Sequence, residues 1–175
     1  MDFHAFTLLD RNYLIQHYPN PQRWEEFELE NDNPVRDENN WSKWIKYLND
    51  DGSTISDEFL NLPSATGAIY VFEIKGGPLP FLDSYLLYIG RVQLTKDQDL
   101  RKRVYKYAHP EKESRLLIQD MIECWGKYLY FRYCCDDDNS RIRHTEKQLI
   151  GAIAPPYNSV FPKRIKTMPT QKAFK

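Results

Sequence analysis

Two kinds of hydrophobic periodicity follow one another along this chain, and the pattern changes near residue 64. From there on, three stretches rich in β-branched and aromatic residues predict strands: 68–74, 85–92 and 127–135. Three segments carry apolar side chains at helical spacing and stop at a glycine or proline: 98–110, 111–126 and 143–154. The predicted order is therefore ββααβα. Turn-forming residues over 75–80 favour a hairpin between the first two strands.

The first 63 residues have a different pattern. Residues 19–40 are rich in Pro, Asn, Asp and Glu, which is typical of loops, with one short helix around 24–29. Four apolar residues at positions i, i+3, i+4 and i+7 then predict one face of a helix: Trp41, Trp44, Ile45 and Leu48. Residues 56–63 predict one more short helix that ends at a proline.

These patterns predict an α/β (α+β) fold, with a small, mostly antiparallel three-stranded sheet flanked by helices. We assign this domain to residues 64–160. Residues 1–63 are predicted to form an acidic helical appendage at the N-terminus, and residues 161–175 a basic tail without usable periodicity.

Charge is divided unevenly along the chain. The net charge of −1 conceals −8 over residues 1–62 and +7 over residues 63–175. A basic part of this kind can bind a polyanion, although segregated surface charge without a ligand explains the same counts. The acidic part could compete for the basic face or contact a protein partner.

Three observations bear on location. No stretch approaches the roughly 18 apolar residues that a membrane helix needs, and the N-terminus is a poor signal peptide. Cys124, Cys134 and Cys135 have no metal-binding spacing, and we interpret them as reduced thiols, the adjacent pair pointing to opposite faces of a strand. The sequence therefore predicts a cytoplasmic protein without a membrane partner.

Two tripeptides lie on the predicted hairpin: "AIY" at 68–70 on its first strand and "YIG" at 88–90 on its second. Four further residues follow on the predicted helices and after the last of them: Arg103, Tyr107, Glu146 and Asn158. In this order and on these elements, the residues resemble the motifs of the GIY-YIG nucleases, over about residues 66–160. Ala68 stands where the first glycine of that family is expected, and the linkers between the motifs are longer than is typical.

The chemistry of these residue types agrees with the resemblance. Phosphodiester hydrolysis needs an activated water and stabilisation of the charge on the phosphoryl oxygens. Arg103 suits those oxygens, because a guanidinium binds them bidentately and keeps its charge. Glu146 suits a hard cation such as Mg²⁺ or Mn²⁺, which takes few protein oxygens.

The resemblance also assigns roles to the tyrosines. It makes Tyr70 the general base and Tyr88 the residue that orients water or phosphate. A free phenol has a pKa of about 10, so a nearby cation would have to favour the phenolate. Tyr107 and Asn158 complete the predicted catalytic set.

Five residues are predicted to contact nucleic acid: Gly90, Arg91, Lys102, Lys106 and His144. Gly90 would let the strand end close to the substrate, and Arg91 would add a cation beside a phosphate. His144 lies two residues before Glu146 and thus far around the helix from it, so a surface histidine explains it as well.

The resemblance implies a metal-dependent endonuclease that hydrolyses phosphodiester bonds in DNA, either a small restriction-type enzyme or one from a phage or mobile element. Two alternatives stay open: a non-cleaving nucleic-acid-binding module on the same fold, and a nuclease subunit regulated by a partner. The sequence also leaves open whether the protein forms a homodimer.

Overall fold

Residues 27, 29–75, 84–109 and 115–159 are described by the computed structural model. Their strands are β1 (Ile45–Lys46), β2 (Gly67–Ile74), β3 (Tyr85–Val92) and β4 (Leu129–Asp136). Their α-helices are α3 (Asp57–Leu60), α4 (Leu100–Tyr105), α5 (Leu116–Trp125) and α6 (Asn139–Ile153). Three short 3₁₀ helices complete the set: η1 (Pro34–Arg36), η2 (Glu38–Asn40) and η4 (Gly126–Tyr128). Within these residues, no helix combines the length and the apolar character needed to cross a membrane.

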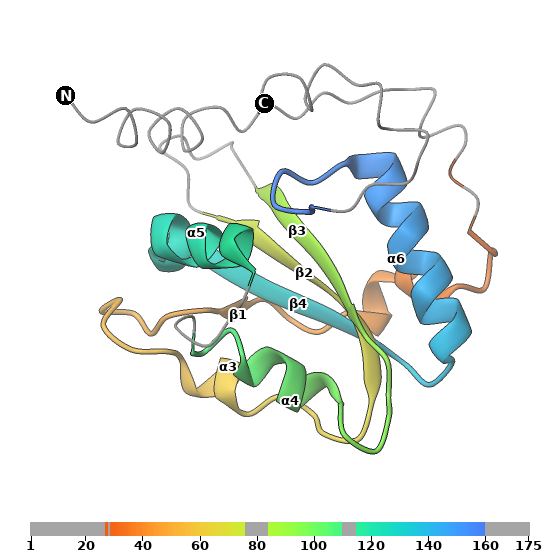
Figure 1. Ribbon diagram of the computed structural model, residues 1–175, viewed down its shortest axis with the longest axis horizontal. Helices are drawn as coiled ribbons and strands as arrows, with labels where there is room; N and C mark the ends of the chain where they lie inside the picture. The colour runs from red at the N-terminus through yellow and green to blue at the C-terminus, as the bar shows by residue number, and fades with distance from the viewer. Residues whose placement is uncertain (1–26, 28, 76–83, 110–114, 160–175) are drawn as a thin grey trace.

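The strands form one antiparallel sheet in the order β1-β4-β2-β3 (Figure 1). The predicted ββααβα order is confirmed by β2, β3, α4, α5, β4 and α6, and the predicted hairpin is the β2–β3 pair. The prediction of three strands is wrong, because β1 adds a fourth strand beside β4. The fold class α+β is confirmed.

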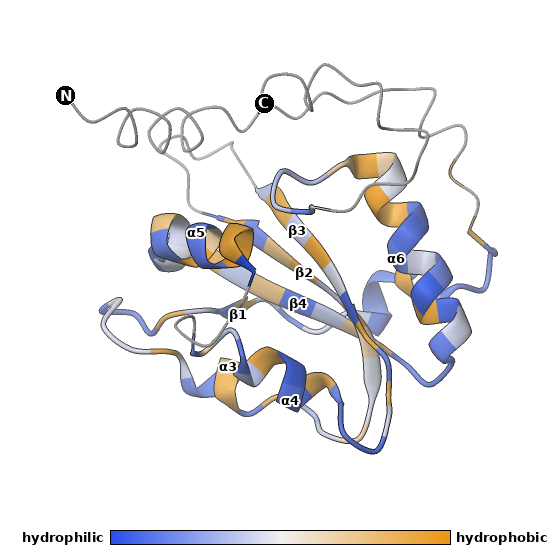
Figure 2. Cartoon of the chain, viewed as in Figure 1, coloured by the Kyte–Doolittle hydropathy of each residue, from blue (hydrophilic) through white to orange (hydrophobic). Residues whose placement is uncertain are grey.

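The two faces of the sheet are covered by different helices. One face presents residues such as Tyr70 and Phe72 to a core that includes apolar residues of α3, α4 and α5. The other face presents Ile69, Val71 and Ile89 to α6 (Figure 1). Figure 2 shows the amphipathic character of α5 and α6, in which apolar and polar residues both recur along the helix.

The predicted helix over residues 41–48 is wrong. Trp41 instead forms a β-bridge with Cys134, and Ile45 pairs with Phe131 of β4. Backbone hydrogen bonds hold this extended segment against β4, from Ser42 N to Tyr133 O at 2.8 Å and from Tyr47 N to Leu129 O at 2.9 Å. Ile45 and Tyr47 are both buried, so the period of two that fits a sheet edge prevails over the helical spacing of the tryptophans.

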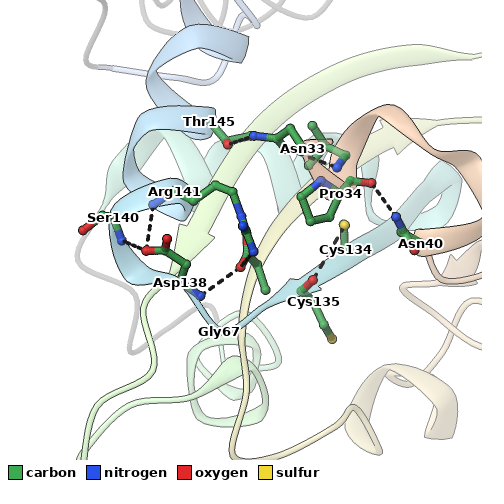
Figure 3. A network of polar contacts seen from close by, with 12 residues as sticks. Asn33, Pro34, Asn40, Gly67, Cys134, Cys135, Asp138, Ser140, Arg141 and Thr145 are labelled. Atoms are coloured by element: carbon green, nitrogen blue, oxygen red, sulfur yellow. Dashed lines mark hydrogen bonds and ion pairs between the residues drawn. The ribbon is translucent and has the colours of Figure 1, made fainter. Parts of the chain in front are cut away.

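Residues before position 63 belong to the same core as those after it. Tyr47, Phe59 and Leu62 pack in the cluster that contains the residues of β2. On the other face, the Asn33 amide donates a buried hydrogen bond of 2.8 Å to Thr145 Oγ1 of α6 (Figure 3). In the described part of the chain, the predicted appendage is thus integrated into the sheet and its helices. The predicted helix around 24–29 and the tail over 161–175 lie almost wholly outside the described residues.

Phe59→Ala tests this integration. Phe59 is 1% exposed and touches the rings of Tyr47, Phe72 and Phe131. We expect the substitution to lower the free energy of unfolding by about 3 kcal/mol, as measured by urea denaturation, because it removes a large buried side chain. Leu60→Ala, at a neighbouring residue that is 41% exposed, is the matched control and should change stability little. Equal effects of the two substitutions would contradict a shared core.

The turn before α6 caps this helix. The Asp138 carboxylate accepts hydrogen bonds from the backbone of Ser140 and Arg141, at 2.8 and 3.2 Å (Figure 3). The Arg141 guanidinium donates two hydrogen bonds to the Asp136 carboxylate. The prediction that Cys134 and Cys135 point to opposite faces is also confirmed, since the first is buried and the second exposed.

Candidate active site

The two tripeptides meet on neighbouring strands. Tyr70 lies opposite Gly90, and Phe72 lies opposite Tyr88. Because side chains alternate along a strand, Tyr70 and Tyr88 project from the same face of the sheet. Their ring centroids are 6.3 Å apart. Both tyrosines therefore face one region.

Gly90 is required by the packing of Tyr70. A Cβ atom at position 90 would lie 2.5 Å from the Tyr70 hydroxyl oxygen and would overlap the ring itself. The Tyr70 ring therefore crosses directly over the backbone of β3. Tyr70 is 0% exposed, so it has no free space into which to move. The glycine of the second tripeptide thus fixes the position of the tyrosine of the first.

Gly90→Ala should lower the free energy of unfolding by about 2 kcal/mol, because the added methyl group forces the Tyr70 ring to shift inside a packed core. Near-ultraviolet circular dichroism should change as well, since aromatic side chains surround Tyr70. Gly126→Ala is the matched control: a Cβ there meets its nearest atom at 3.6 Å, an ordinary contact. A Gly90→Ala protein as stable as wild type would contradict the close approach.

Three tyrosine hydroxyls and two guanidinium groups form one cluster over this face. The Tyr70 and Tyr107 hydroxyls are hydrogen-bonded to each other at 2.6 Å. Arg103 Nε donates to the Tyr70 hydroxyl at 3.3 Å. Arg115 donates to the Tyr88 hydroxyl and to the Tyr107 hydroxyl, both at 3.0 Å. We call these five residues the tyrosine–arginine cluster.

Helix α4 positions the first half of the cluster. The Asp99 carboxylate caps the helix by accepting from Lys102 N at 2.9 Å and also accepts from Ala65 N at 3.2 Å. Leu100 and Val104 are buried, which fixes the rotation of the helix about its axis. Arg103 is consequently directed to the hydroxyl of Tyr70.

The second half of the cluster comes from the segments that follow α4. Tyr107 lies in the turn after this helix, and its carbonyl oxygen accepts a hydrogen bond of 2.7 Å from the Tyr47 hydroxyl. Arg115 stands at the N-cap position of α5. Arg115 was not predicted from the sequence, because an arginine at the start of a helix carries no motif and its contacts depend on how α4 and α5 pack.

Burial determines the protonation of the tyrosines. It raises the pKa of Tyr70 well above its usual value, an effect that Tyr107 and Tyr88 reinforce and the Arg103 charge opposes. Burial likewise raises the pKa of Tyr88, and the charges of Arg115 and Arg103 oppose it. Both phenols are therefore protonated in this state, and the guanidinium groups alone do not produce the phenolate that the sequence analysis predicted for Tyr70.

This burial predicts a loss of stability in alkali. A phenol whose pKa is raised in the folded state contributes stability that is complete below the unfolded value of about 10 and declines as the pH rises above it. Tyr70→Phe cannot ionise at this position. Between pH 8.5 and 11, wild type should therefore lose more unfolding free energy than Tyr70→Phe, by about 1 kcal/mol, in paired urea titrations. Parallel losses in the two proteins would contradict a raised Tyr70 pKa.

Glu146 reaches the same end of the sheet from the other face. It lies on α6 between buried Ile142 and Ile150, and its carboxylate forms an ion pair and hydrogen bond with Arg91 of β3. Burial raises the Glu146 pKa, while the charges of Arg91 and then Arg103 oppose this shift. The influence of Arg103 connects the carboxylate electrostatically with the tyrosine–arginine cluster.

The carboxylate of Glu146 fits the predicted Mg²⁺ or Mn²⁺. Among the described residues, no group of three or more His, Cys, Asp or Glu side chains could enclose a metal ion. A hard cation at a phosphoryl-transfer site needs only one or two carboxylates, since water and substrate oxygens supply the other ligands. Glu146 is partly exposed, and its carboxylate is at present paired with the guanidinium of Arg91, so a metal ion would bind there in competition with this arginine.

The remaining predicted residues lie around this core. Asn158 binds the backbone of the second tripeptide. Its side chain accepts a hydrogen bond from Ile89 N at 3.0 Å and donates one to Ile89 O at 2.7 Å. Lys102 and Lys106 are exposed on and beside α4. His144 is exposed on α6. Among the described residues, no hydrogen bond or ion pair joins these three side chains to the tyrosine–arginine cluster.

Comparisons with known proteins assign neither a family nor a function to this site. No family model matches the sequence, and searches of curated proteins and of solved structures find no significant match.

Proposed function

We propose that this protein is a divalent-metal-dependent nuclease that hydrolyses phosphodiester bonds in DNA. The observation that carries the proposal is the tyrosine–arginine cluster, with Glu146 within electrostatic reach of Arg103. Two guanidinium groups beside three hydroxyls suit a tetrahedral anion with several oxygens, such as a phosphodiester.

Arg103 supplies the first function that this reaction needs. Among the described residues, no carboxylate lies within 4.0 Å of its guanidinium, whose one hydrogen bond is the long one to Tyr70. Arg103 is therefore available to bind phosphoryl oxygens, whose charge increases in the transition state. Arg115 donates to the other two hydroxyls of the cluster, those of Tyr88 and Tyr107, and would hold the phosphate from a second direction.

Tyr70 is our candidate for the general base. Its hydroxyl contacts Tyr107 and Arg103. For water to reach this fully buried hydroxyl, Arg103 would have to turn away from it toward a bound phosphate. In the reactive state Tyr70 would be a phenolate, its own proton having passed to solvent. The oxygen of the water would then bond to phosphorus, the water's proton would pass to the phenolate oxygen, and the bond from phosphorus to the leaving oxygen would break. A metal ion bound to Glu146 would supply the positive charge that favours the phenolate and stabilises the leaving oxygen.

A non-cleaving binding module is the competing proposal. Such a module needs cations at its surface, whereas Arg103 and Arg115 donate to the hydroxyls of three buried tyrosines, groups that can bind and transfer protons. This arrangement around Tyr70 favours the enzyme.

The test is a cleavage assay with purified protein. Supercoiled plasmid, linear duplex, single-stranded DNA and RNA are each incubated with Mg²⁺, with Mn²⁺ and with a chelator, and the products are separated on gels. We expect cleavage of DNA only when metal is present. Binding without cleavage of any substrate in either metal would replace the nuclease proposal with the binding module. Cleavage of RNA alone would change the proposed substrate from DNA to RNA.

A further inference from the structure

The ion pair between Arg91 and Glu146 occupies the carboxylate that the proposed metal requires. Arg91 directly follows the "YIG" tripeptide and lies opposite Ile69 on β2, on the face that α6 covers. Glu146 projects from α6 toward this face, and its side chain is 18% exposed. The pair is therefore an internal contact between strand and helix at the margin of the proposed site.

A guanidinium and a divalent cation compete for such a carboxylate. The guanidinium needs the carboxylate oxygens as hydrogen-bond acceptors, and the metal ion needs them as ligands. At close range the positive charges of the two groups also repel each other. The positive charge of Arg103 also acts on Glu146. If Arg91 stayed paired with Glu146, a divalent metal ion would therefore add two positive charges beside two guanidinium groups. Metal binding at Glu146 thus requires Arg91 to move away.

Arg91 can move. Its side chain is 34% exposed, and among the described residues its one hydrogen-bond partner is Glu146. A phosphate of bound DNA offers a guanidinium the same kind of charge-assisted hydrogen bond that it gives up at the carboxylate. The polyanion can therefore take Arg91 from Glu146 and leave the carboxylate to the metal.

We propose that Arg91 is a displaceable counter-ion of Glu146, which keeps divalent cations from binding until DNA draws the arginine away. This inference rests on the proposed nuclease function and adds a coupling between its two ligands. DNA and metal bind cooperatively, and each raises the affinity for the other by the same factor. Arg91 acts on the metal through Glu146 and is a positioning residue.

Mn²⁺ binding to the protein without DNA tests the coupling, with free Mn²⁺ measured by electron paramagnetic resonance. Arg91→Ala should bind Mn²⁺ about tenfold or more tightly than wild type, because the competing charge-assisted hydrogen bond is gone. Arg91→Lys keeps a competing cation and should stay near wild type. Arg143→Ala is the matched control, since it removes an exposed guanidinium from α6 one turn before Glu146 and should leave the affinity unchanged.

Thermal unfolding gives a second readout. Without metal, Arg91→Ala should melt at a lower temperature than wild type, because the partly buried Glu146 carboxylate loses its counter-ion. Added Mn²⁺ should raise the melting temperature of Arg91→Ala more than that of wild type, an effect that a purely structural ion pair would not produce. The rise should vanish in the double variant Arg91→Ala/Glu146→Gln.

Two results would overturn the counter-ion role. One is an Arg91→Ala protein with the Mn²⁺ affinity of wild type. The other is a wild-type protein that binds Mn²⁺ equally well with and without a phosphorothioate duplex, which keeps its charges but resists cleavage. Failure of the nuclease proposal is distinguishable, because it would appear as absent cleavage by wild type in the assay above, whatever the Mn²⁺ affinities.

Discussion

Glu146→Gln should reduce DNA cleavage by about four orders of magnitude while leaving DNA binding intact. The amide keeps the size of the side chain but gives up the charge that a divalent metal needs, and losing the metal removes about 5 kcal/mol of transition-state stabilisation. DNA binding should not weaken, because Arg91 loses its carboxylate partner and becomes available to a phosphate. Single-turnover cleavage and fluorescence anisotropy, each with Mg²⁺ and with Mn²⁺, measure the two effects.

The control for this substitution is Glu123→Gln, at an exposed position of α5. It removes the same charge from the protein without touching the site, and it should cleave like wild type. If Glu146→Gln cleaves within about tenfold of wild type, a difference of about 1.4 kcal/mol, the metal role of Glu146 is wrong.

Arg103→Ala should lose about three to four orders of magnitude in cleavage, and Arg103→Lys should recover little of it. Alanine removes the cation that we place on the phosphoryl oxygens. Lysine restores the charge but not the planar group whose Nε donates to Tyr70 while its other nitrogens remain available to phosphate. Values of kcat under saturating duplex separate this loss from weaker binding.

Lys102→Ala provides the comparison on the same helix, because Lys102 is exposed and its side chain donates to Lys96 O in place of a hydroxyl of the tyrosine–arginine cluster. It should weaken DNA binding slightly, with a loss that shrinks as salt rises, and leave kcat near wild type. Near-wild-type turnover by Arg103→Lys would mean that Arg103 contributes only a positive charge.

Local patterns were sufficient to predict the hairpin, the three longer helices and their order. The spacing of apolar residues that distinguishes the strands β2 and β3 from the helices α5 and α6 lies within each segment. These elements could therefore be recognised without knowing any contact between distant residues. The segment around Trp41 and Trp44 shows the opposite case. Its helical spacing is real, but pairing with β4, nearly ninety residues later in the chain, satisfies its backbone instead.

The candidate site was likewise predictable only in part. Tyr70, Tyr88, Arg103 and Glu146 could be selected because their residue types suit phosphodiester chemistry and the motif orders them. The position of Arg115 depends on the packing of two helices, and the pairing of Arg91 with Glu146 depends on α6 crossing β3. Such relations between distant elements leave no trace in the spacing of residues.

The position of Asn158 has a consequence for how this protein can meet other chains. β3 is the outer strand of the sheet, and the segment after α6 covers the middle of its free edge: Tyr157 N donates to Leu87 O, and the Asn158 amide occupies both backbone groups of Ile89. The strand at the opposite edge, β1, is only two residues long. Within the residues that the structure describes, neither margin therefore offers a long unpaired backbone on which a strand of another molecule could add, and such protected edges disfavour edge-to-edge aggregation. At these two edges a partner of the described part of the chain would meet side chains and loops in place of an open strand.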